Sequence, residues 1–487
     1  MNAAPHFASS SLDQTLLEAI ECLKSSQLDQ AQQLAEEVLQ KQPGREEGLY
    51  VLALVAYAKE QFESAKRFLE QLLSLNPTNP GYLAYMADTL ALMEDYHGAE
   101  RHYQAALSLQ PQDVEALVNL GRTQVKLQRL DEAVRSFSQA LTLRPDHPDN
   151  MRELAVCLSH LGRMAPALNL LEKAVKLDPE SGEVHHSYAF ALLKDGRYPE
   201  GWQEMTWRFK SNHYRKLHGA QFQHPFWEGN ERPDIHLMLI CEQGFGDVIQ
   251  MIRYAPLVAE KVGRLSIYTT EELERLMGAI PGVDYVAIDS RDPVLGDVSH
   301  CLPTLHLPLV FETTPETIPS TKGLFVLSEQ ERGAASSLPD QKMDDGRLRI
   351  GLVWTGKSHQ GFQFEYLAPL LALEGPRFYS LQYGPAGDLV TGHPGIADLR
   401  PLMGDFADTA GLIREMDLVI STDTAVAHLA GTLGVETWVM LHEQADWRWG
   451  LGGDRTPWYP SVRLFRQRAL GGWQGVVEAM VGGLIGR

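Results

Sequence analysis

Two different rhythms of apolar and polar residues divide this chain of 487 residues. Through residues 11–210, small and apolar positions return with a fixed long period, as expected of packed helical repeats. From residue 235 onward, short apolar runs such as "IHLMLI" and "RLSIYTT" alternate with amphipathic segments such as "DVIQMIRYAPLVAEKV". Strands that alternate with helices indicate βαβ units and a parallel sheet. The pattern therefore predicts a helical half followed by an α/β half.

The first half has a period of 34 residues. A proline recurs at this spacing, an alanine stands twelve residues before each proline, and a small residue stands ten residues after it. Small residues at fixed positions let the two helices of a repeat approach closely, and the proline ends the second helix. The prolines are Pro43, Pro77, Pro111, Pro145 and Pro179, the alanines are Ala31, Ala65, Ala99, Ala133 and Ala167, and the later small residues are Ala53, Ala87, Gly121, Ala155 and Ala189.

This pattern resembles the tetratricopeptide repeat (TPR), and we assign an α-helical TPR superhelix to residues 11–215, after a flexible N-terminus at 1–10. The last unit, "SGEVHHSYAFALLKDGRYPEGWQEMTWRF", becomes rich in tryptophan and tyrosine. Large aromatic residues there predict a capping unit that is buried against another domain. The resemblance implies a concave face that holds an extended peptide or a partner protein. The alternative is a spacer or a dimerisation arm, which would make the chain a homo-oligomer.

The second half reads as two alternating α/β units. A connector at residues 216–235 leads into a first Rossmann-like domain at 236–340. The rhythm weakens near residues 329–347, and a second Rossmann-like domain is expected at 345–487 with strands in "LRIGLVW", "FYSLQ", "DLVIST", "ETWVML" and "VRLFRQ". Two such domains side by side place a cleft between them, and ligands of parallel sheets bind at the carboxyl ends of the strands.

The loop "STDTAVAHLAGTLG" follows one of these strands. We expect the carboxylate of Asp423 to cap the first amides of the next helix, and such amides favour a phosphate. Thr424 and His428 lie four residues apart and so share a helix face that could meet the phosphate and sugar of a nucleotide. The alternative is an ordinary N-cap next to a histidine that is satisfied by protein partners.

Two further loops of the second domain offer polar groups. "WTGKSH" contains Thr355, Gly356, Lys357 and His359, and a lysine there suits the diphosphate of a nucleotide-sugar because it needs no planar geometry. Gln382 is the first residue after the run "FYSL". A solvated turn is the alternative for the lysine loop.

The loop "EQGFGDVIQ" follows the first strand of the first domain. Gly244 and Gly246 allow a tight turn and a close approach of a ligand. Asp247 then faces the cleft, where it could accept a proton from an attacking hydroxyl, or simply cap the helix. Ile249 and Gln250 stand where the third glycine of a dinucleotide fingerprint would fall, which disfavours a dinucleotide-dependent oxidoreductase.

Charge and composition limit the partners. The formal net charge of -20 argues against nucleic acid or an anionic membrane as the main partner. The chain has no apolar run long enough to span a bilayer, no secretory signal pattern and four widely spaced cysteines, so we expect a cytoplasmic protein. No P-loop, H-E-x-x-H, G-x-S-x-G, Cys/His metal spacing or strict Asp-x-Asp occurs, and no metal or cofactor is expected.

Several motifs together resemble the bacterial TPR glycosyltransferases, whose catalytic half is similar to the heptosyltransferase family and more distantly to O-GlcNAc transferase. They are "EQGFGDVIQMIRYAPLVAEK", "GLVWTGKSH", "SLQYGP", "DFADTAGLIREMDLVISTDTAVAHLAGTLG" and "DWRWGLGGDRTPWYPSVRLFRQ". The resemblance implies a GT-B fold, inversion at the anomeric carbon, a nucleotide-sugar as co-substrate and no metal. It also implies that Asp247 is the base and that Asp423, Thr424, Ala425 and His428 contact the donor.

One motif departs from this family. Relatives follow the tryptophan loop with an aspartate and an Arg-Ser pair, whereas no arginine stands here between Lys357 and Arg377. Lys357 could supply the missing positive charge, or the donor could be a sugar carried on CMP, which has one phosphate.

We therefore expect a protein O-glycosyltransferase whose repeats capture a protein acceptor, as some flagellin-modifying members do. The first alternative is an enzyme with a lipid or polysaccharide acceptor. The second is a scaffold whose transferase half has lost activity.

Overall fold

The computed structural model describes residues 11–211, 224–289, 291–329, 338, 346–356, 362–468 and 471–486. The expected flexible N-terminus, residues 216–223 of the predicted connector and most of the predicted boundary at 329–347 lie outside these residues. The chain divides into two compact units, Met1–Pro179 and Glu180–Arg487. No helix within the described ranges is both long enough and apolar enough to cross a bilayer.

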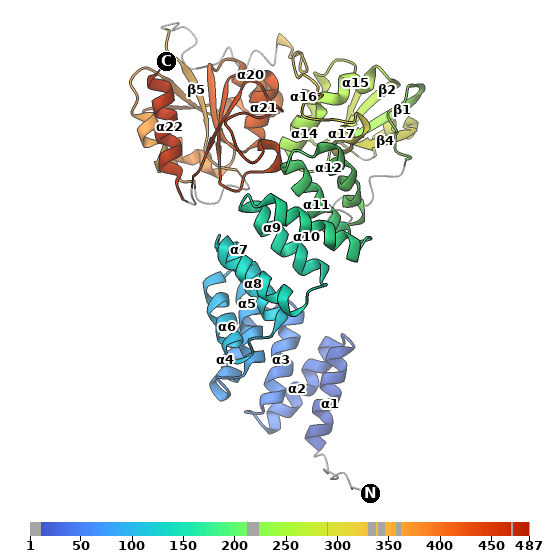
Figure 1. The fold of residues 1–487 in the computed structure, drawn as a ribbon, viewed down its shortest axis with the longest axis vertical. Helices are drawn as coiled ribbons and strands as arrows, with labels where there is room; N and C mark the ends of the chain where they lie inside the picture. Colours follow the sequence, from blue (N-terminus) through green and yellow to red (C-terminus); the bar gives the residue numbers. More distant parts are fainter. Residues whose placement is uncertain are drawn as a thin grey trace. The chain divides into compact units, whose positions relative to one another are not determined.

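The first unit is an array of paired helices (Figure 1). Each predicted proline lies two residues beyond the second helix of a pair, which confirms its role in ending that helix. The helices are α1 Ser11–Lys24, α2 Leu28–Lys41, α3 Glu46–Ala58, α4 Phe62–Leu75, α5 Pro80–Leu92, α6 Tyr96–Leu109, α7 Val114–Lys126, α8 Leu130–Leu143, α9 Pro148–His160 and α10 Met164–Leu177.

Close packing explains the periodic small residues. All five predicted alanines in the second helices are fully buried. A Cβ added at Gly121 of α7 would lie 2.7 Å from the ring of Phe137 in α8, so only glycine fits there without a shift. The 34-residue period is therefore the spacing of helix-to-helix contacts.

The last helical pair, α11 Gly182–Lys194 and α12 Tyr198–Met205, belongs to the second unit. Trp202 is 1% exposed and donates its indole N–H to the carbonyl oxygen of Thr313 at 3.1 Å. Tyr198 accepts a 3.0 Å hydrogen bond from the indole of Trp458, and burial raises the pKa of Tyr198 to about 12. The expectation that this aromatic unit is buried against another domain is confirmed.

The first α/β half (residues 224–329) contains a parallel sheet of four strands in the order β3-β2-β1-β4. The strands are β1 Arg232–Ile240, β2 Val262–Tyr268, β3 Tyr285–Ala287 and β4 His300–Pro303. Its helices include α14 Phe245–Met251, α15 Ala255–Ala259, α16 Glu274–Gly278 and α17 Leu307–Val310. Because β1 starts at Arg232, the end of the predicted connector is already strand.

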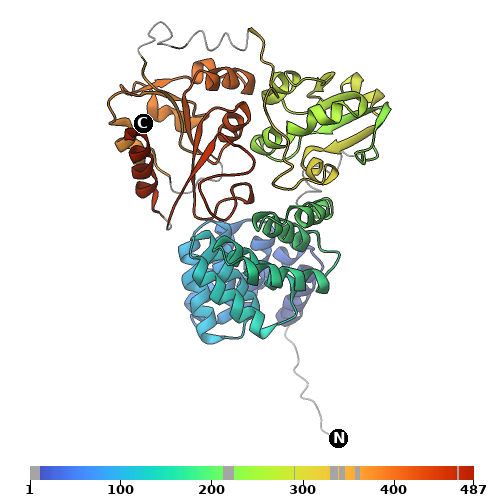
Figure 2. The same cartoon turned by 45° about the horizontal axis from the view of Figure 1, so that its top comes forward.

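The second α/β half (residues 346–486) contains a parallel sheet of six strands in the order β10-β9-β8-β5-β6-β7. Counted from β5, this is the order 3-2-1-4-5-6 of doubly wound nucleotide-binding sheets. The strands are β5 Arg349–Val353, β6 Arg377–Ser380, β7 Ile396–Asp398, β8 Leu418–Thr422, β9 Thr437–Leu441 and β10 Val462–Arg466. Figure 2 shows the two sheets as separate halves, yellow-green and orange-red.

Helices cover both faces of the second sheet. One face packs on α19 Ala368–Leu371 and α22 Trp473–Ile485. The other face packs on α20 Phe406–Arg414 and α21 Ala425–Leu433. The central strands β5, β8 and β9 are buried on both sides, so their apolar residues form nearly continuous runs, whereas the edge strand β10 exposes Arg463.

A buried ion pair anchors the hairpin α11–α12 to the first α/β half. Arg208, just after α12, donates to the carboxylate of Glu242 at 2.7 Å, and both side chains are almost fully buried. Glu242 also accepts the backbone N–H of Leu305 at 3.2 Å. Removing one partner of such a pair would leave a buried charge uncompensated.

The first prediction concerns where the chain can be cut. A protein that starts at Glu180 should stay folded because it keeps the hairpin, whereas one that starts at residue 224 exposes Trp458 and leaves Glu242 without Arg208. We expect the second protein to melt roughly 5–10 °C lower, since a lost buried partner costs about 3 kcal/mol or more. Thermal unfolding followed by circular dichroism compares the two. Equal melting temperatures would contradict this account of the hairpin.

The second prediction concerns His306, whose pKa falls to about 4 because of burial and the neighbouring charge of Arg208. The unfolded chain takes up this proton below about pH 6.5, but the folded chain only near pH 4. The contribution to stability is therefore complete above pH 6.5 and decreases by about 3 kcal/mol as the pH falls through this window.

His306→Phe provides the comparison, because the ring lies near those of Phe209 and Phe226 and phenylalanine cannot titrate. Urea unfolding from pH 7 to pH 4 should show a shallower loss of stability for the variant. Parallel curves for the two proteins would show that His306 does not titrate on unfolding.

Candidate active site

The loops after β5 and β8 meet at one edge of the second sheet. These strands are neighbours, yet their connections run to opposite sides of the sheet, which makes this the topological switch point. Thr355 and Gly356 follow β5, and Asp423 and Thr424 follow β8. Crevices at switch points are where open α/β sheets bind their ligands. The structure thus brings these four predicted residues to one edge, while Lys357 and His359 lie outside the described residues.

The helix α14 carries the predicted residues of the first half to the same place. It begins after Gly244, directly beyond the carboxyl end of β1, and it packs against α21 of the second half. Figure 1 draws α14 and α21 on facing sides of the two halves. Asp247 and the Asp423 loop, 176 residues apart in sequence, are therefore carried by two helices in direct contact.

Gly246 of α14 lies close against α21. A Cβ at this position would lie 2.8 Å from Cδ2 of His428 and 3.7 Å from the backbone of Ala425. The space that we expected Gly246 to clear for a ligand is filled by the His428 ring. The glycine is needed here for packing between the two halves.

Both carboxylate oxygens of Asp247 have protein partners. One oxygen accepts the backbone N–H of Gly244 at 3.0 Å, so the helix-capping alternative is confirmed. The other oxygen accepts from the guanidinium of Arg448, and this ion pair joins the two α/β halves. Asp247 keeps 25% of its side chain exposed. Two-point attachment holds the carboxylate in one orientation, as a general base requires.

Arg448 is the site residue that our sequence analysis missed. It stands in "DWRWG" after β9, and its guanidinium also pairs with Asp446 at 2.7 Å and packs on the ring of Trp447. Burial alone would lower the pKa of Arg448, but the charges of Asp247 and Asp446 outweigh burial and raise it. The motif was visible in the sequence, whereas its proximity to Asp247 was not.

The expectation that Asp423 caps α21 is wrong. The N-cap residue is Thr424, and no side chain caps the first turn of this helix. The carboxylate of Asp423 instead lies 3.6 Å from Nε2 of His428. Burial by itself would raise the pKa of Asp423, but the neighbouring His428 and the charge of Arg448 together lower it.

His428 is a buried histidine with protein partners on both ring nitrogens. Nδ1 lies 2.9 Å from the hydroxyl of Tyr459, Nε2 faces Asp423, and the ring stacks on Trp449. Only 4% of the residue is exposed. The structure therefore matches the alternative of a satisfied histidine, and the helix face of Thr424 and His428 does not present the imidazole to solvent.

Gln382 braces the loop after β5. Its side-chain oxygen accepts the backbone N–H groups of Trp354 and Thr355, both at 3.0 Å. Its side-chain nitrogen donates to the carbonyl oxygens of Thr355 and Tyr383. With four hydrogen bonds to backbone, Gln382 positions the predicted ligand loop and has no polar atom left for a direct donor contact.

Three further arginines cross between the two α/β halves. Arg253 donates to the carbonyl oxygen of Trp458 at 3.0 Å, and Arg414 donates to that of Phe325 at 2.9 Å. Arg275 pairs with both Asp405 and Asp408 at the start of α20. Among the described residues, no group of three or more His, Cys, Asp or Glu side chains has an arrangement that could hold a metal ion.

The third prediction tests the contact at Gly246. Alanine there should destabilise the protein by about 1–3 kcal/mol, because the His428 ring is fixed by Trp449 and Tyr459 and cannot move aside. Gly475→Ala is the matched control: this glycine is also helical, but nothing lies within 4 Å of an added Cβ. The control should be neutral or stabilised by up to about 1 kcal/mol. Urea denaturation measures both, and equal stabilities would contradict the packing role.

One protein and two solved structures are similar to part of this chain. Protein FlbA of Caulobacter vibrioides is 27% identical over 323 residues, which are 59% of this chain and 52% of FlbA. The chain thus spans about half the length of this curated relative. The TPR protein YrrB is 22% identical, with 36% of this chain and 89% of YrrB covered and a TM-score of 0.33. PilF of Pseudomonas aeruginosa is 16% identical, with 43% and 93% covered and a TM-score of 0.37.

Three family models match the helical region. The model described as "Anaphase-promoting complex, cyclosome, subunit 3" matches residues 24–106. Two models described as "Tetratricopeptide repeat" match residues 86–148 and 128–186. The helical region of this chain therefore contains tetratricopeptide repeats, joined to a region of parallel α/β sheets.

Proposed function

We propose that this chain is an inverting, metal-independent glycosyltransferase of the GT-B type, which transfers a sugar from a nucleotide-sugar to a Ser or Thr hydroxyl of a protein. The observation that carries the proposal is the packing of α14 on α21. This contact brings the carboxylate of Asp247 from one parallel sheet next to the switch-point loop of a second one.

The second α/β half is the proposed nucleotide site. Its strand order is that of nucleotide-binding sheets, and its switch point lies between Thr355 and Thr424. The first turn of α21, a helix of nine residues, carries no side-chain cap, so its backbone N–H groups are suited to a phosphate. Gln382 would act there by holding the Thr355 backbone in place.

Asp247 is the proposed base. It would accept the proton of the acceptor hydroxyl while the hydroxyl oxygen forms a bond to the anomeric carbon. The bond from that carbon to the phosphate oxygen breaks, and its electron pair leaves with the nucleotide. Attack opposite to the leaving group inverts the configuration.

The repeats are the proposed acceptor site, for a flagellin-like protein. Polar side chains link the first helices of successive repeats: Asn119 donates to Asp88 at 3.0 Å, and Arg122 donates to Glu153 at 3.0 Å. These polar side chains, which hydrogen-bond to one another, can also hydrogen-bond to the backbone of an extended peptide. The hairpin α11–α12 follows this array in the sequence and belongs to the unit that contains the α/β halves.

The fourth prediction tests this function through Asp247→Asn, which keeps the shape of the side chain and removes its basicity. The variant should transfer sugar at least about 100-fold more slowly. Source cells that lack the gene are supplied with the wild-type or the variant chain, and the masses of their abundant proteins are compared by mass spectrometry. Wild type should restore a sugar-sized mass on one protein, and the variant should not.

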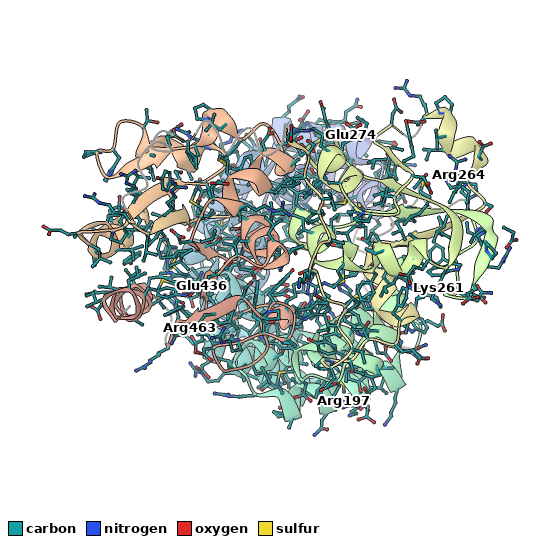
Figure 3. The ribbon with its side chains drawn as sticks, turned by 90° about the horizontal axis from the view of Figure 1, so that it is seen from above. Arg197, Lys261, Arg264, Glu274, Glu436 and Arg463 are labelled. Carbon is teal, nitrogen blue, oxygen red and sulfur yellow. The ribbon has the colours of Figure 1, made fainter. Side chains whose placement is uncertain are left out.

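Arg463→Gln is the control for this experiment, because Arg463 is 45% exposed and pairs only with Asp454 among the charged groups described. Figure 3 shows Arg463 and Glu436 on the second half, Lys261, Arg264 and Glu274 on the first, and Arg197 on the hairpin. Arg463→Gln should restore the sugar-sized mass as the wild-type chain does. Full restoration of the mass by Asp247→Asn would refute the assigned base.

A scaffold without transferase activity is the second candidate. It is favoured by one observation: Asp247, Gln382 and His428 all have their polar atoms engaged by the protein itself. In that case, neither loss of the gene nor Asp247→Asn changes the mass of any protein. A sugar-sized difference that depends on Asp247 excludes this candidate.

A further inference from the structure

We propose that Arg448 is a phosphate-binding residue that changes partners during the reaction, releasing Asp247 when the donor phosphate arrives. The inference rests on the proposed function, since it names a second residue of the same site.

The position of Arg448 fits this role. Its side chain is only 10% exposed and bridges the two α/β halves. One terminal nitrogen pairs with Asp446 of its own loop, Nε donates to Gln250 of α14, and the other terminal nitrogen pairs with Asp247. The first two contacts hold the guanidinium in place, so the third partner can be replaced without moving the side chain.

Arg448 pairs with one oxygen of Asp247 and the Gly244 N–H with the other, so each oxygen has one lone pair fewer to offer an acceptor hydroxyl. A phosphate oxygen that takes the guanidinium N–H releases the first oxygen for the acceptor hydroxyl. Planar guanidinium groups bind phosphate and carboxylate oxygens with the same geometry, which makes this exchange chemically direct. The base would thus become fully available only after the donor has bound.

Gln250 provides a second, independent observation. It is fully buried, and its side-chain oxygen accepts from Arg448, which fixes the orientation of the amide. Its side-chain nitrogen has no hydrogen-bond partner in the described part of the chain. An unpaired buried donor next to Arg448 is costly and is suited to an oxygen acceptor.

The carboxylates around Arg448 determine whether a substitution raises or lowers its affinity for phosphate. Three carboxylates, Asp247, Asp423 and Asp446, act on this one guanidinium. A phosphate must therefore compete with Asp247 for Arg448, and the negative charge of Asp247 also repels it. Removing the charge of Asp247 should strengthen phosphate binding, although the same change is expected to abolish transfer.

The fifth prediction measures this competition with inorganic pyrophosphate, titrated into the full chain in a calorimeter at low ionic strength. Asp247→Asn should bind pyrophosphate about tenfold more tightly than wild type, the effect of one close charge pair. Arg448→Gln should bind at least about tenfold more weakly, and adding Asp247→Asn to it should restore clearly less than the gain that Asp247→Asn gives when Arg448 is present. If Arg448→Gln does not fold, Arg448→Lys replaces it in the test. The lysine keeps the charge, so this variant should retain part of the affinity for pyrophosphate.

Arg463→Gln serves as the control for loss of a surface arginine and should bind like wild type. Unchanged affinity in Asp247→Asn, or wild-type affinity in a folded Arg448→Gln protein, would overturn the exchange of partners. The outcome is separate from the test of function, because no sugar transfer is measured. Loss of transfer in Asp247→Asn without a gain in pyrophosphate affinity would leave the transferase standing and remove this inference.

Discussion

The close contact between α14 and α21 is the constraint on which the site depends. At Gly246 the absence of a side chain lets the ring of His428 lie against the first half. Because α14 also carries Asp247, and the turn before α21 carries Asp423, this contact sets the relation between the two carboxylates. The His428 ring is in turn held by Trp449 and by Tyr459. Packing by itself is therefore a sufficient reason for the glycine and the histidine of these two motifs.

Arginines extend this contact across the whole boundary between the α/β halves. Arg253, Arg275 and Arg414 donate from one half to backbone or carboxylate oxygens of the other. Arg448 differs from them because its partner, Asp247, is the residue proposed to react. The same type of contact that joins the halves could then be exchanged for a ligand at one point, while the others keep the halves together.

The helical hairpin α11–α12 connects the repeat architecture to this site. By its spacing it is one more repeat, yet Trp202 and Tyr198 bind it to both α/β halves, and Arg208 inserts into the first half to pair with Glu242. Buried aromatic area and a paired buried charge make this hairpin part of the α/β core. The hairpin is therefore rigidly attached to the two α/β halves.

The sequence by itself determined the repeats, their period and the strands that form continuous apolar runs, because each depends on local spacing and on burial of both sheet faces. It did not reveal β4, nor the strands β3 and β7, whose three residues each are too few for a pattern. It also hid the left-handed turn between the helices of each repeat, which falls on Ser26, Glu60, Glu94, Gln128, Gly162 and Gly196 and so mostly on residues that are not glycine. Only the tertiary structure placed Arg448 beside Asp247, and only there does the side-chain amide of Gln382 form all its hydrogen bonds with backbone groups. The reason is physical: such partners lie far apart along the chain, and their meeting is decided by how two sheets and a hairpin pack, not by any local pattern.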